Sequence, residues 1–222
     1  MKRIPMSMMI AALLIAAVAP ACGPPARSQD TKSVEVREYR GEKLDPIANF
    51  EENSIKGPQR VDLGTYRLTV GGLAGRPLSL TYDEVLARPA VSRVTIIHCV
   101  EGWDVKVLWE GVTLTALIDE AEARPAANTV IFRSADGYST SLPLEYIKRK
   151  DILLASKMNG LTLPAERGYP FLVVAEDKWG YKWAKWVTAI ELTSDPNYRG
   201  YWESRGYSNN GDHSGPIFEK KR

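Results

Sequence analysis

The chain has few of the residues that bind metals or form disulfides. Its 222 residues include only 2 cysteines and 2 histidines. Two cysteines exclude a disulfide-rich scaffold and an all-cysteine zinc site, and two histidines disfavour a site built from several histidines. The chain also lacks an excess of one charge, because it has 29 Lys and Arg residues and 27 Asp and Glu residues. This balance excludes a strongly basic nucleic-acid binder and a polyacidic tail.

No apolar run is long enough to cross a bilayer as a helix. The longest, Met8 to Val18, follows the basic Lys2 and Arg3, as the h-region follows the n-region of a signal peptide. Ala19-Pro20-Ala21-Cys22 resembles a bacterial lipobox, in which the cysteine is lipidated. We therefore predict a signal peptide over 1–21 and export to the periplasm or the outer side of a membrane, with Cys22 as lipid anchor. Ordinary signal cleavage and an uncleaved anchor are the alternatives.

Residues 22–45 are mostly polar and predict a tether between membrane and folded body. Removal of residues 1–21 leaves equal numbers of basic and acidic residues, which further excludes nucleic acid as a partner. If Cys22 carries lipid, Cys99 has no cysteine partner in an oxidising compartment. A lone thiol there is either buried and inert or functional.

Short strands and short helices without a regular βαβ period favour a mixed α+β domain. Strands are predicted where β-branched and apolar residues alternate or cluster, over 65–70, 94–98, 129–133, 171–175 and 186–192. Helices are predicted over 81–87, with Thr81 and Glu84 as a capping box, and over 113–123 and 144–148. Asp136-Gly137 predicts a turn. Residues 195–222 predict either a long ordered loop or a partly mobile tail.

Cys99 lies at the end of a predicted buried strand, within Ile97-His-Cys-Val-Glu-Gly-Trp103. A cysteine on a rigid strand, followed by a turning backbone, is presented as a metal ligand or a nucleophile would be. The alternative is a small apolar residue of the core. A nucleophile pair of His98 and Cys99 is disfavoured, because adjacent strand residues point to opposite faces.

Aromatic and basic residues are interleaved from Lys178 to Trp186. The pattern predicts one of three structures. The first is an amphipathic hairpin with snorkelling lysines. The second is a surface for single-stranded nucleic acid, which export and zero net charge disfavour. The third is a pocket that stacks a flat heterocycle and holds a phosphate.

Several short motifs occur in a fixed order along the chain. They are His98-Cys-Val-Glu-Gly-Trp103, Trp109-Glu-Gly111, Asp136-Gly-Tyr-Ser-Thr-Ser-Leu-Pro-Leu-Glu145, Gly160 to Pro164, Gly168-Tyr-Pro170, Trp179-Gly-Tyr-Lys182 and Lys185-Trp-Val-Thr188. Together they resemble the molybdopterin-binding domain of the sulfite oxidase superfamily, and most nearly its compact bacterial branch, which includes periplasmic methionine-sulfoxide reductase catalytic subunits. The resemblance covers residues 46–208. It implies one domain of mixed-sheet sulfite-oxidase type, followed by a C-terminal tail over 209–222.

The resemblance implies molybdenum bound by the dithiolene of one molybdopterin, with Cys99 as the metal ligand from the protein. A soft thiolate suits such a centre, and one cysteine is enough because the cofactor supplies the other sulfurs. Tyr138 matches an active-site tyrosine, and Glu101 is expected near the metal, where it would bias proton transfer or exclude anions. The implied cofactor contacts are Phe50, Glu51, Glu52, Asn53, Cys99, Ser134, Arg167, Trp183, Ala184 and Lys185.

The sequence departs from the family at four positions. Leu172 stands where many relatives have an arginine that helps to hold the cofactor phosphate. Glu51 and Glu52 stand where sulfite oxidases prefer a basic residue. An acidic Glu101 beside the metal disfavours sulfite, because sulfite is a dianion at neutral pH.

The resemblance implies an exported molybdoenzyme that transfers an oxygen atom to or from a small or protein-bound substrate in a two-electron step. No Cys-x-x-Cys-His haem motif is present. A separate electron-transfer partner is therefore expected, either a membrane haem protein or a cytochrome c. The alternatives are a binding lipoprotein that keeps the fold without redox chemistry, suggested by Leu172 and by the lack of a twin-arginine signal, and a cysteine-nucleophile hydrolase or transferase.

Overall fold

The computed structural model describes residues 34–219, which belong to one compact unit. The predicted signal peptide and Cys22 lie outside the described residues. Within residues 34–219, no helix has both the length and the apolarity that a membrane crossing requires.

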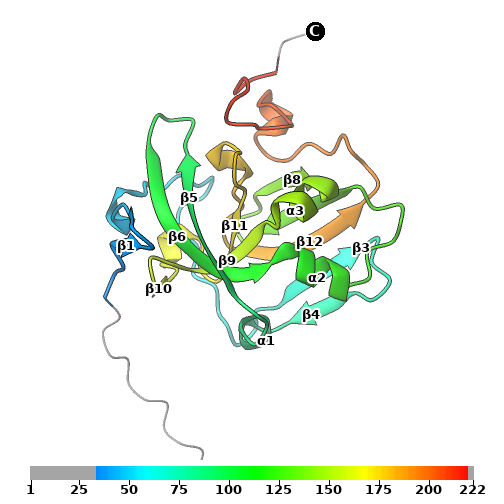
Figure 1. Cartoon of the computed structure of the whole chain (residues 1–222). Helices are drawn as coiled ribbons and strands as arrows, with labels where there is room; N and C mark the ends of the chain where they lie inside the picture. The colour runs from blue at the N-terminus through cyan, green and yellow to red at the C-terminus, as the bar shows by residue number, and fades with distance from the viewer. Residues whose placement is uncertain (1–33, 220–222) are drawn as a thin grey trace, which may run out of the picture. The chain divides into compact units, whose positions relative to one another are not determined.

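The first large sheet is antiparallel (Figure 1). One edge of it is a long hairpin in which β5 (Val91–His98), the strand that Cys99 follows, pairs with β6 (Asp104–Thr113). On the other side of β6 lies β9 (Leu153–Met158), which also pairs with β10 (Leu161–Thr162) and β11 (Leu172–Val174). The hairpin therefore holds Cys99 at the end of a continuous ladder.

The second large sheet is mixed, with the strand order β4-β3-β12-β7-β8. Its strands are β3 (Leu68–Gly72), β4 (Leu78–Leu80), β7 (Thr129–Ser134), β8 (Ser139–Pro143) and β12 (Val187–Thr193). β3 and β12 run parallel, and the other neighbours run antiparallel. The parallel pair joins segments more than a hundred residues apart in the chain.

The described helices are short. They are α1 (Tyr82–Leu86), α2 (Leu114–Glu120) and α3 (Leu144–Lys150), with 3-10 turns η1 (Ile47–Asn49), η2 (Ala165–Arg167), η3 (Gly180–Lys182) and η4 (Glu203–Arg205). At the start of α1 the Thr81 side chain accepts from the Glu84 N–H, and the Glu84 carboxylate accepts from the Thr81 N–H. The predicted capping box is confirmed.

One hydrophobic core joins the two large sheets. It includes Trp109 of β6, Leu154 of β9, Phe132 of β7 and Ile190 of β12, all almost completely buried. Because both sheets bury side chains in the same cluster, neither would be stable alone. The predicted single α+β domain is confirmed.

The body begins before residue 46. β1 (Glu38–Tyr39) and β2 (Glu42–Lys43) form a small hairpin, Leu44 is buried, and the Val36 N–H donates to the Asn159 carbonyl at 2.9 Å. The part of the predicted tether from residue 34 onward is therefore packed on the body. The tether was predicted from the polar composition of the segment. Backbone hydrogen bonds, which composition does not reveal, attach it to the body.

The predicted strands over 94–98, 129–133, 171–175 and 186–192 correspond to β5, β7, β11 and β12, and the strand over 65–70 begins later, as β3. The predicted helices correspond to α1, α2 and α3. The amphipathic hairpin over 178–186 is wrong, because this stretch is a loop around η3 in which Lys178 and Lys182 are buried. Residues 195–219 form an ordered irregular segment, the first of the two alternatives.

Candidate functional site

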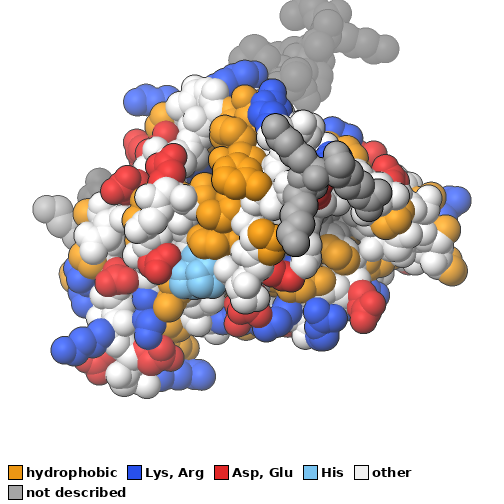
Figure 2. Space-filling model, turned by 90° about the horizontal axis from the view of Figure 1, so that it is seen from above, with side chains coloured by type: hydrophobic (Ala, Val, Ile, Leu, Met, Phe, Trp, Pro, Cys, Tyr) orange, Lys and Arg blue, Asp and Glu red, His pale blue; other side chains and the backbone are white. Residues whose placement is uncertain are grey.

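A cavity of about 330 Å³ opens beside Cys99, at the end of β5. Its walls come from residues 50–55, 97–103, 136–138, 180–186 and 202–218. Most of the lining is aromatic or aliphatic. Seen from above, the molecule carries a band of hydrophobic side chains next to a histidine (Figure 2). A cavity with apolar walls and a few polar groups is the usual form of a small-molecule site.

The backbone around Cys99 forms a closed turn. The Cys99 N–H donates to the Trp103 carbonyl at 2.9 Å, and the Gly102 N–H donates to the Cys99 carbonyl at 3.1 Å. Gly102 has a φ of 91°, which a side-chain-bearing residue rarely adopts. The Cys99 thiol is unpaired, is buried, and lies 3.8 Å from the Asn53 side-chain oxygen. The turn therefore fixes one free sulfur at the cavity wall.

Burial raises the pKa of the Cys99 thiol, and the negative charges of Glu101 and Glu51 raise it further. Hydrogen bonds from the Glu101 and Val100 backbone oppose this rise. A cysteine nucleophile needs a lowered pKa, which neighbouring cations or a histidine provide. The surroundings of Cys99 do the opposite, and this disfavours the hydrolase or transferase alternative. A bound metal cation would stabilise the thiolate.

The cavity is acidic. Its charged lining residues are Glu51, Glu101, Asp136 and Lys185. The single cation, Lys185, is paired with the Glu52 carboxylate at 2.8 Å. Burial lowers the pKa of Lys185, and the contact with Glu52 counteracts this. The Asn53 amide donates to the Glu101 carboxylate at 2.6 Å and so joins the 50–53 loop to the hairpin turn. An anion entering this cavity would meet a net negative charge.

Tyr138 also lines the cavity, from the turn between β7 and β8. Its N–H donates to the Asp136 carboxylate at 2.9 Å, and the Ser134 N–H donates to its carbonyl at 3.0 Å. The predicted turn at Asp136-Gly137 is present, with Gly137 at a φ of 86°. The Tyr138 hydroxyl donates to the Tyr181 carbonyl. Burial raises the pKa of Tyr138 well above its ordinary value, so the phenol keeps its proton.

The buried polar atoms that lack a hydrogen-bond partner in the described part of the chain include two that belong to predicted cofactor contacts. They are Oγ of Ser134, at the end of β7, and Nη1 of Arg167, in η2. The Arg167 guanidinium lies 5.0 Å from the centre of the Phe50 ring, and burial lowers its pKa. Unpaired buried donors are costly. Such atoms mark places where a ligand supplies the missing hydrogen bonds.

The structure brings most of the predicted site residues together. Those that line the cavity are Phe50, Glu51, Asn53, Cys99, Glu101, Tyr138, Trp183 and Lys185, whereas Glu52, Ser134, Arg167 and Ala184 do not. Glu52 reaches the site through Lys185, and Ala184 is buried in the core with its carbonyl bonded to the Val173 N–H. No group of three or more Asp, Glu, His or Cys able to hold a metal occurs among residues 34–219. A metal at Cys99 would therefore need further ligands from a cofactor.

His98 points away from the thiol. Its Nδ1 lies 2.8 Å from the Asp104 carboxylate, and its ring stacks on His213 at 3.7 Å. None of the described contacts of the His98 ring involves the Cys99 sulfur. This agrees with the opposite facing of adjacent strand residues.

Sequence analysis did not identify the wall formed by the C-terminal segment. Trp202, Tyr207, Ile217 and Phe218 all line the cavity. The aromatic richness of 195–222 was the available signal, but it did not show which body segment the aromatics would contact. The C-terminal segment is attached to the loop around η3. Buried Lys178 and Lys182 of that loop are each paired with an acidic residue of the segment.

Three comparisons with known proteins identify the fold and its family. The family model described as "Oxidoreductase molybdopterin binding domain" matches residues 55–202. An uncharacterised oxidoreductase of Bacillus subtilis, YuiH, is 34% identical over 156 residues, which are 70% of this chain and 78% of that protein. A putative protein-methionine-sulfoxide reductase subunit of Azospira oryzae, YedZ1, is 36% identical over 151 residues, which are 68% of this chain and 57% of that protein.

Among solved structures, the sulfane dehydrogenase SoxCD from Paracoccus pantotrophus matches with a TM-score of 0.62 and 25% identity. The match covers 65% of this chain and 42% of the SoxCD chain. The chain thus spans less than two thirds of YedZ1 and of SoxCD, so their whole activities do not transfer directly. The family model nevertheless covers most of this chain and contains Cys99, Tyr138 and the basic cofactor contacts predicted from the sequence. The chain therefore belongs to the oxidoreductase molybdopterin-binding domain family of the sulfite oxidase superfamily.

Proposed function

We propose that this protein is an extracytoplasmic oxidoreductase that transfers one oxygen atom in a two-electron step, at molybdenum attached through Cys99. The overall reaction is XO + 2 e⁻ + 2 H⁺ ⇌ X + H₂O, where X is a small or protein-bound oxygen acceptor. The observation that carries the proposal is the free Cys99 thiol, held by a rigid turn at the wall of the cavity. The sulfoxide reductase name of the Azospira relative makes a sulfoxide a reasonable form of XO.

The residues around the cavity fit the cofactor that the family binds. Cys99 offers a soft sulfur ligand. Ser134 and Arg167 offer buried polar atoms whose hydrogen bonds are otherwise missing, and Lys185 adds a positive charge beside them. When bound, the molybdopterin centre supplies the two-electron oxygen-atom exchange. The protein supplies attachment, orientation and electrostatics.

Glu101 and Tyr138 have separate tasks in this proposal. Glu101 places a negative charge at the rim and, with Glu51 and Asp136, repels anionic substrates such as sulfite. Tyr138 keeps its proton because burial raises its pKa, and its hydroxyl is held by the Tyr181 carbonyl. Its single O–H is directed to that carbonyl, so donation to a substrate at neutral pH requires the hydroxyl to exchange this partner for the substrate.

The proposal includes an extracytoplasmic location and a membrane tether through lipid on Cys22. The basic start, the apolar run over 8–18 and the lipobox-like sequence at 19–22 support it. The chain has no haem-attachment motif, so electrons exchange with a separate protein, either a membrane haem protein or a cytochrome c.

Molybdenum analysis of two cysteine variants tests the proposal. The full chain is expressed in a host that makes the cofactor, and metal content and reduction of dimethyl sulfoxide by reduced viologen are measured. Cys99→Ser should lose molybdenum and activity while keeping its circular dichroism spectrum. Cys22→Ser is the matched control: it should keep molybdenum and activity but leave the membrane fraction. Folded wild-type protein without molybdenum, or Cys99→Ser with full metal content, contradicts the proposal.

The second candidate is a binding lipoprotein that keeps the fold without redox chemistry. Leu172 favours it, because this completely buried aliphatic residue lines the cavity where many relatives have an arginine. This candidate predicts a folded protein that takes up no molybdenum even from a cofactor-producing host. The Leu172→Arg variant should then gain cofactor, whereas under the leading proposal Leu172 is compatible with full loading.

A further inference from the structure

Most of one wall of the cavity comes from a part of the chain that the family model does not cover. The match ends at residue 202, yet Tyr207, Ile217 and Phe218 line the cavity together with Trp202. We call these four residues the C-terminal lip. A wall added beyond the shared domain is a place where a chain acquires its own substrate preference.

The lip is a preformed structure. The Ser208 N–H donates to the Ile217 carbonyl at 2.8 Å, and the Glu219 N–H donates to the Gly206 carbonyl at 2.9 Å, so residues 206–219 close on themselves. The Tyr207 ring contacts Trp202 at 5.1 Å and Phe218 at 4.8 Å between ring centres. Aromatic pairs at these distances hold one another in place.

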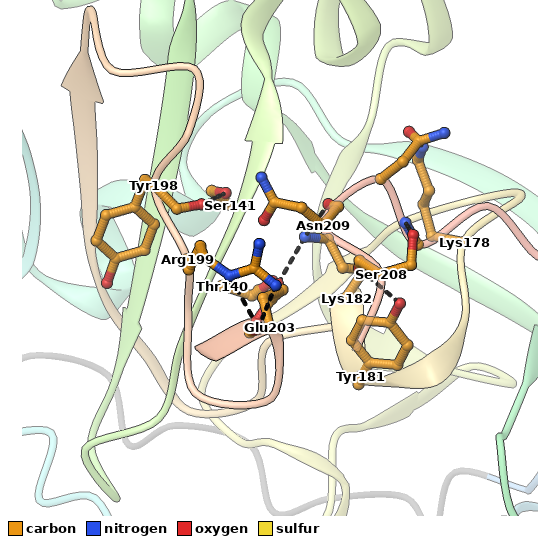
Figure 3. A network of polar contacts seen from close by, with 12 residues as sticks. Thr140, Ser141, Lys178, Tyr181, Lys182, Tyr198, Arg199, Glu203, Ser208 and Asn209 are labelled. Atoms are coloured by element: carbon orange, nitrogen blue, oxygen red, sulfur yellow. Dashed lines mark hydrogen bonds and ion pairs between the residues drawn. The ribbon is translucent and has the colours of Figure 1, made fainter. Parts of the chain in front are cut away.

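Buried polar contacts attach the lip to the segment that carries Tyr181. Lys182 Nζ lies 2.6 Å from the Glu203 carboxylate and donates to the Asn209 carbonyl at 3.0 Å, and the Tyr181 hydroxyl donates to the Ser208 carbonyl at 2.8 Å. Figure 3 shows these groups converging from the η3 loop and the C-terminal segment. Lys182 and Glu203 are completely excluded from solvent. The lip is thus anchored on the same loop whose Tyr181 carbonyl holds Tyr138.

The chemistry of the lip is uniform and uncharged. All four side chains are aromatic or aliphatic, and Phe218 is 58% exposed although it borders a cavity. The charged groups that line the same cavity are three carboxylates and one paired lysine. Apolar surface at the mouth favours an apolar group on the ligand, and the carboxylates exclude a negative charge.

We propose that the C-terminal lip is a binding subsite for an apolar or aromatic substituent on a neutral oxygen-transfer substrate. This rests on the proposed function, because the atom that exchanges oxygen must reach the region of Cys99 while its substituent extends past Tyr207 to Phe218. The lip then distinguishes substrates by the size of that substituent and leaves the smallest ones unaffected.

The test compares two neutral sulfoxides that differ in one substituent, dimethyl sulfoxide and methyl phenyl sulfoxide, in the full-length molybdenum-loaded protein. Phe218→Ala should lower kcat/KM for methyl phenyl sulfoxide by about 10-fold, mainly through KM, because contacts with an apolar pocket change specificity to this degree. Dimethyl sulfoxide should be unaffected. The control Val91→Ala shortens another partly exposed apolar side chain, on an edge strand and outside the cavity lining, and should change neither value.

A second measurement does not depend on turnover. Titration of methyl phenyl sulfide, the product of that reduction, should quench tryptophan fluorescence in the wild type, with an affinity about 10-fold lower in Phe218→Ala. Equal losses for both sulfoxides, unchanged values for both, or a fall in molybdenum content in Phe218→Ala overturn the subsite. If the protein lacks molybdenum, the proposed function fails, and the sulfide titration still decides whether the lip binds an apolar group.

Discussion

The β5–β6 hairpin and the C-terminal segment 195–219 both line one cavity, but they are held by different kinds of contact. The hairpin is fixed by a backbone ladder along its whole length and by β9 on its other side. The C-terminal segment contains no strand of either large sheet. It is held by the ion pairs of Lys178 and Lys182 and by isolated backbone hydrogen bonds, such as the one from the His213 N–H to the Asp177 carbonyl at 2.9 Å. The residue that we assign to the metal lies directly at the end of the ladder, whereas the residues that we assign to the substrate lie on the irregular segment.

This difference has a physical basis. Attachment of a metal requires a sulfur whose position is determined to a fraction of an ångström, and a paired strand provides such rigidity. Recognition of a substrate changes more readily when it depends on a segment outside the sheets, because loops accept substitutions that strands do not. The following variants test whether the two regions really depend on different interactions.

The largest effect is expected from Glu203→Leu. It leaves the Lys182 ammonium completely buried without its partner, and breaking such a pair costs about 3–5 kcal/mol. Urea unfolding measures the loss. The double variant Lys182→Met/Glu203→Leu removes both charges and should regain most of the stability. A double variant as unstable as Glu203→Leu would show that the ion pair is not what holds the segment.

Gly111→Ala tests the hairpin through its backbone. A Cβ at Gly111 would lie 2.1 Å from the Leu154 carbonyl oxygen across the β6–β9 pair, so the strands must separate. Overpacking of this kind costs about 1–3 kcal/mol. Gly71→Ala in β3 is the matched control, since a Cβ there meets nothing within 4 Å. Equal unfolding midpoints for the two variants would contradict a hairpin limited by backbone approach.

The first strand of the hairpin, β5, was predicted from the sequence, whereas the second strand, β6, was not. Cys99 followed a β-branched run, and that local signal was sufficient. β6 was missed although Val105, Val107 and Trp109 alternate, because Leu108 on the other face is also buried. The Asn159 side chain and backbone also bind the Leu108 backbone, next to the β6–β9 pair. Burial of both faces depends on contacts distant in sequence, and a period-two pattern does not reveal it.

The C-terminal segment was predictable in composition but not in position. Its composition left open a long ordered loop or a partly mobile tail, and nothing local showed that Glu203 would pair with Lys182 or that Asp212 would pair with Lys178. Lysines interleaved with aromatics ordinarily extend into solvent. Here a later segment supplies carboxylates that make burial of both ammonium groups tolerable. The candidate site was thus found on its strand side and missed on its C-terminal side.

The smallest effect is expected where the two regions meet. The His98 ring at the end of β5 stacks on His213 of the C-terminal segment at 3.7 Å, and the Trp179 ring meets His213 edge-on at 4.6 Å. Removal of the ring in His213→Ala should cost about 0.5–1.5 kcal/mol, the usual contribution of aromatic pairs.

The loss in His213→Ala should be local rather than global. Hydrogen exchange should accelerate at amides of 206–219, which open independently of the sheets, while the β5–β6 amides keep their protection. His213→Phe keeps a flat ring and should preserve most of the protection. If the β5–β6 amides lose protection together with 206–219, the two regions unfold as one unit and the contrast between them fails. If only 206–219 responds, the substrate wall is a separately adjustable element attached to a rigid metal-binding hairpin.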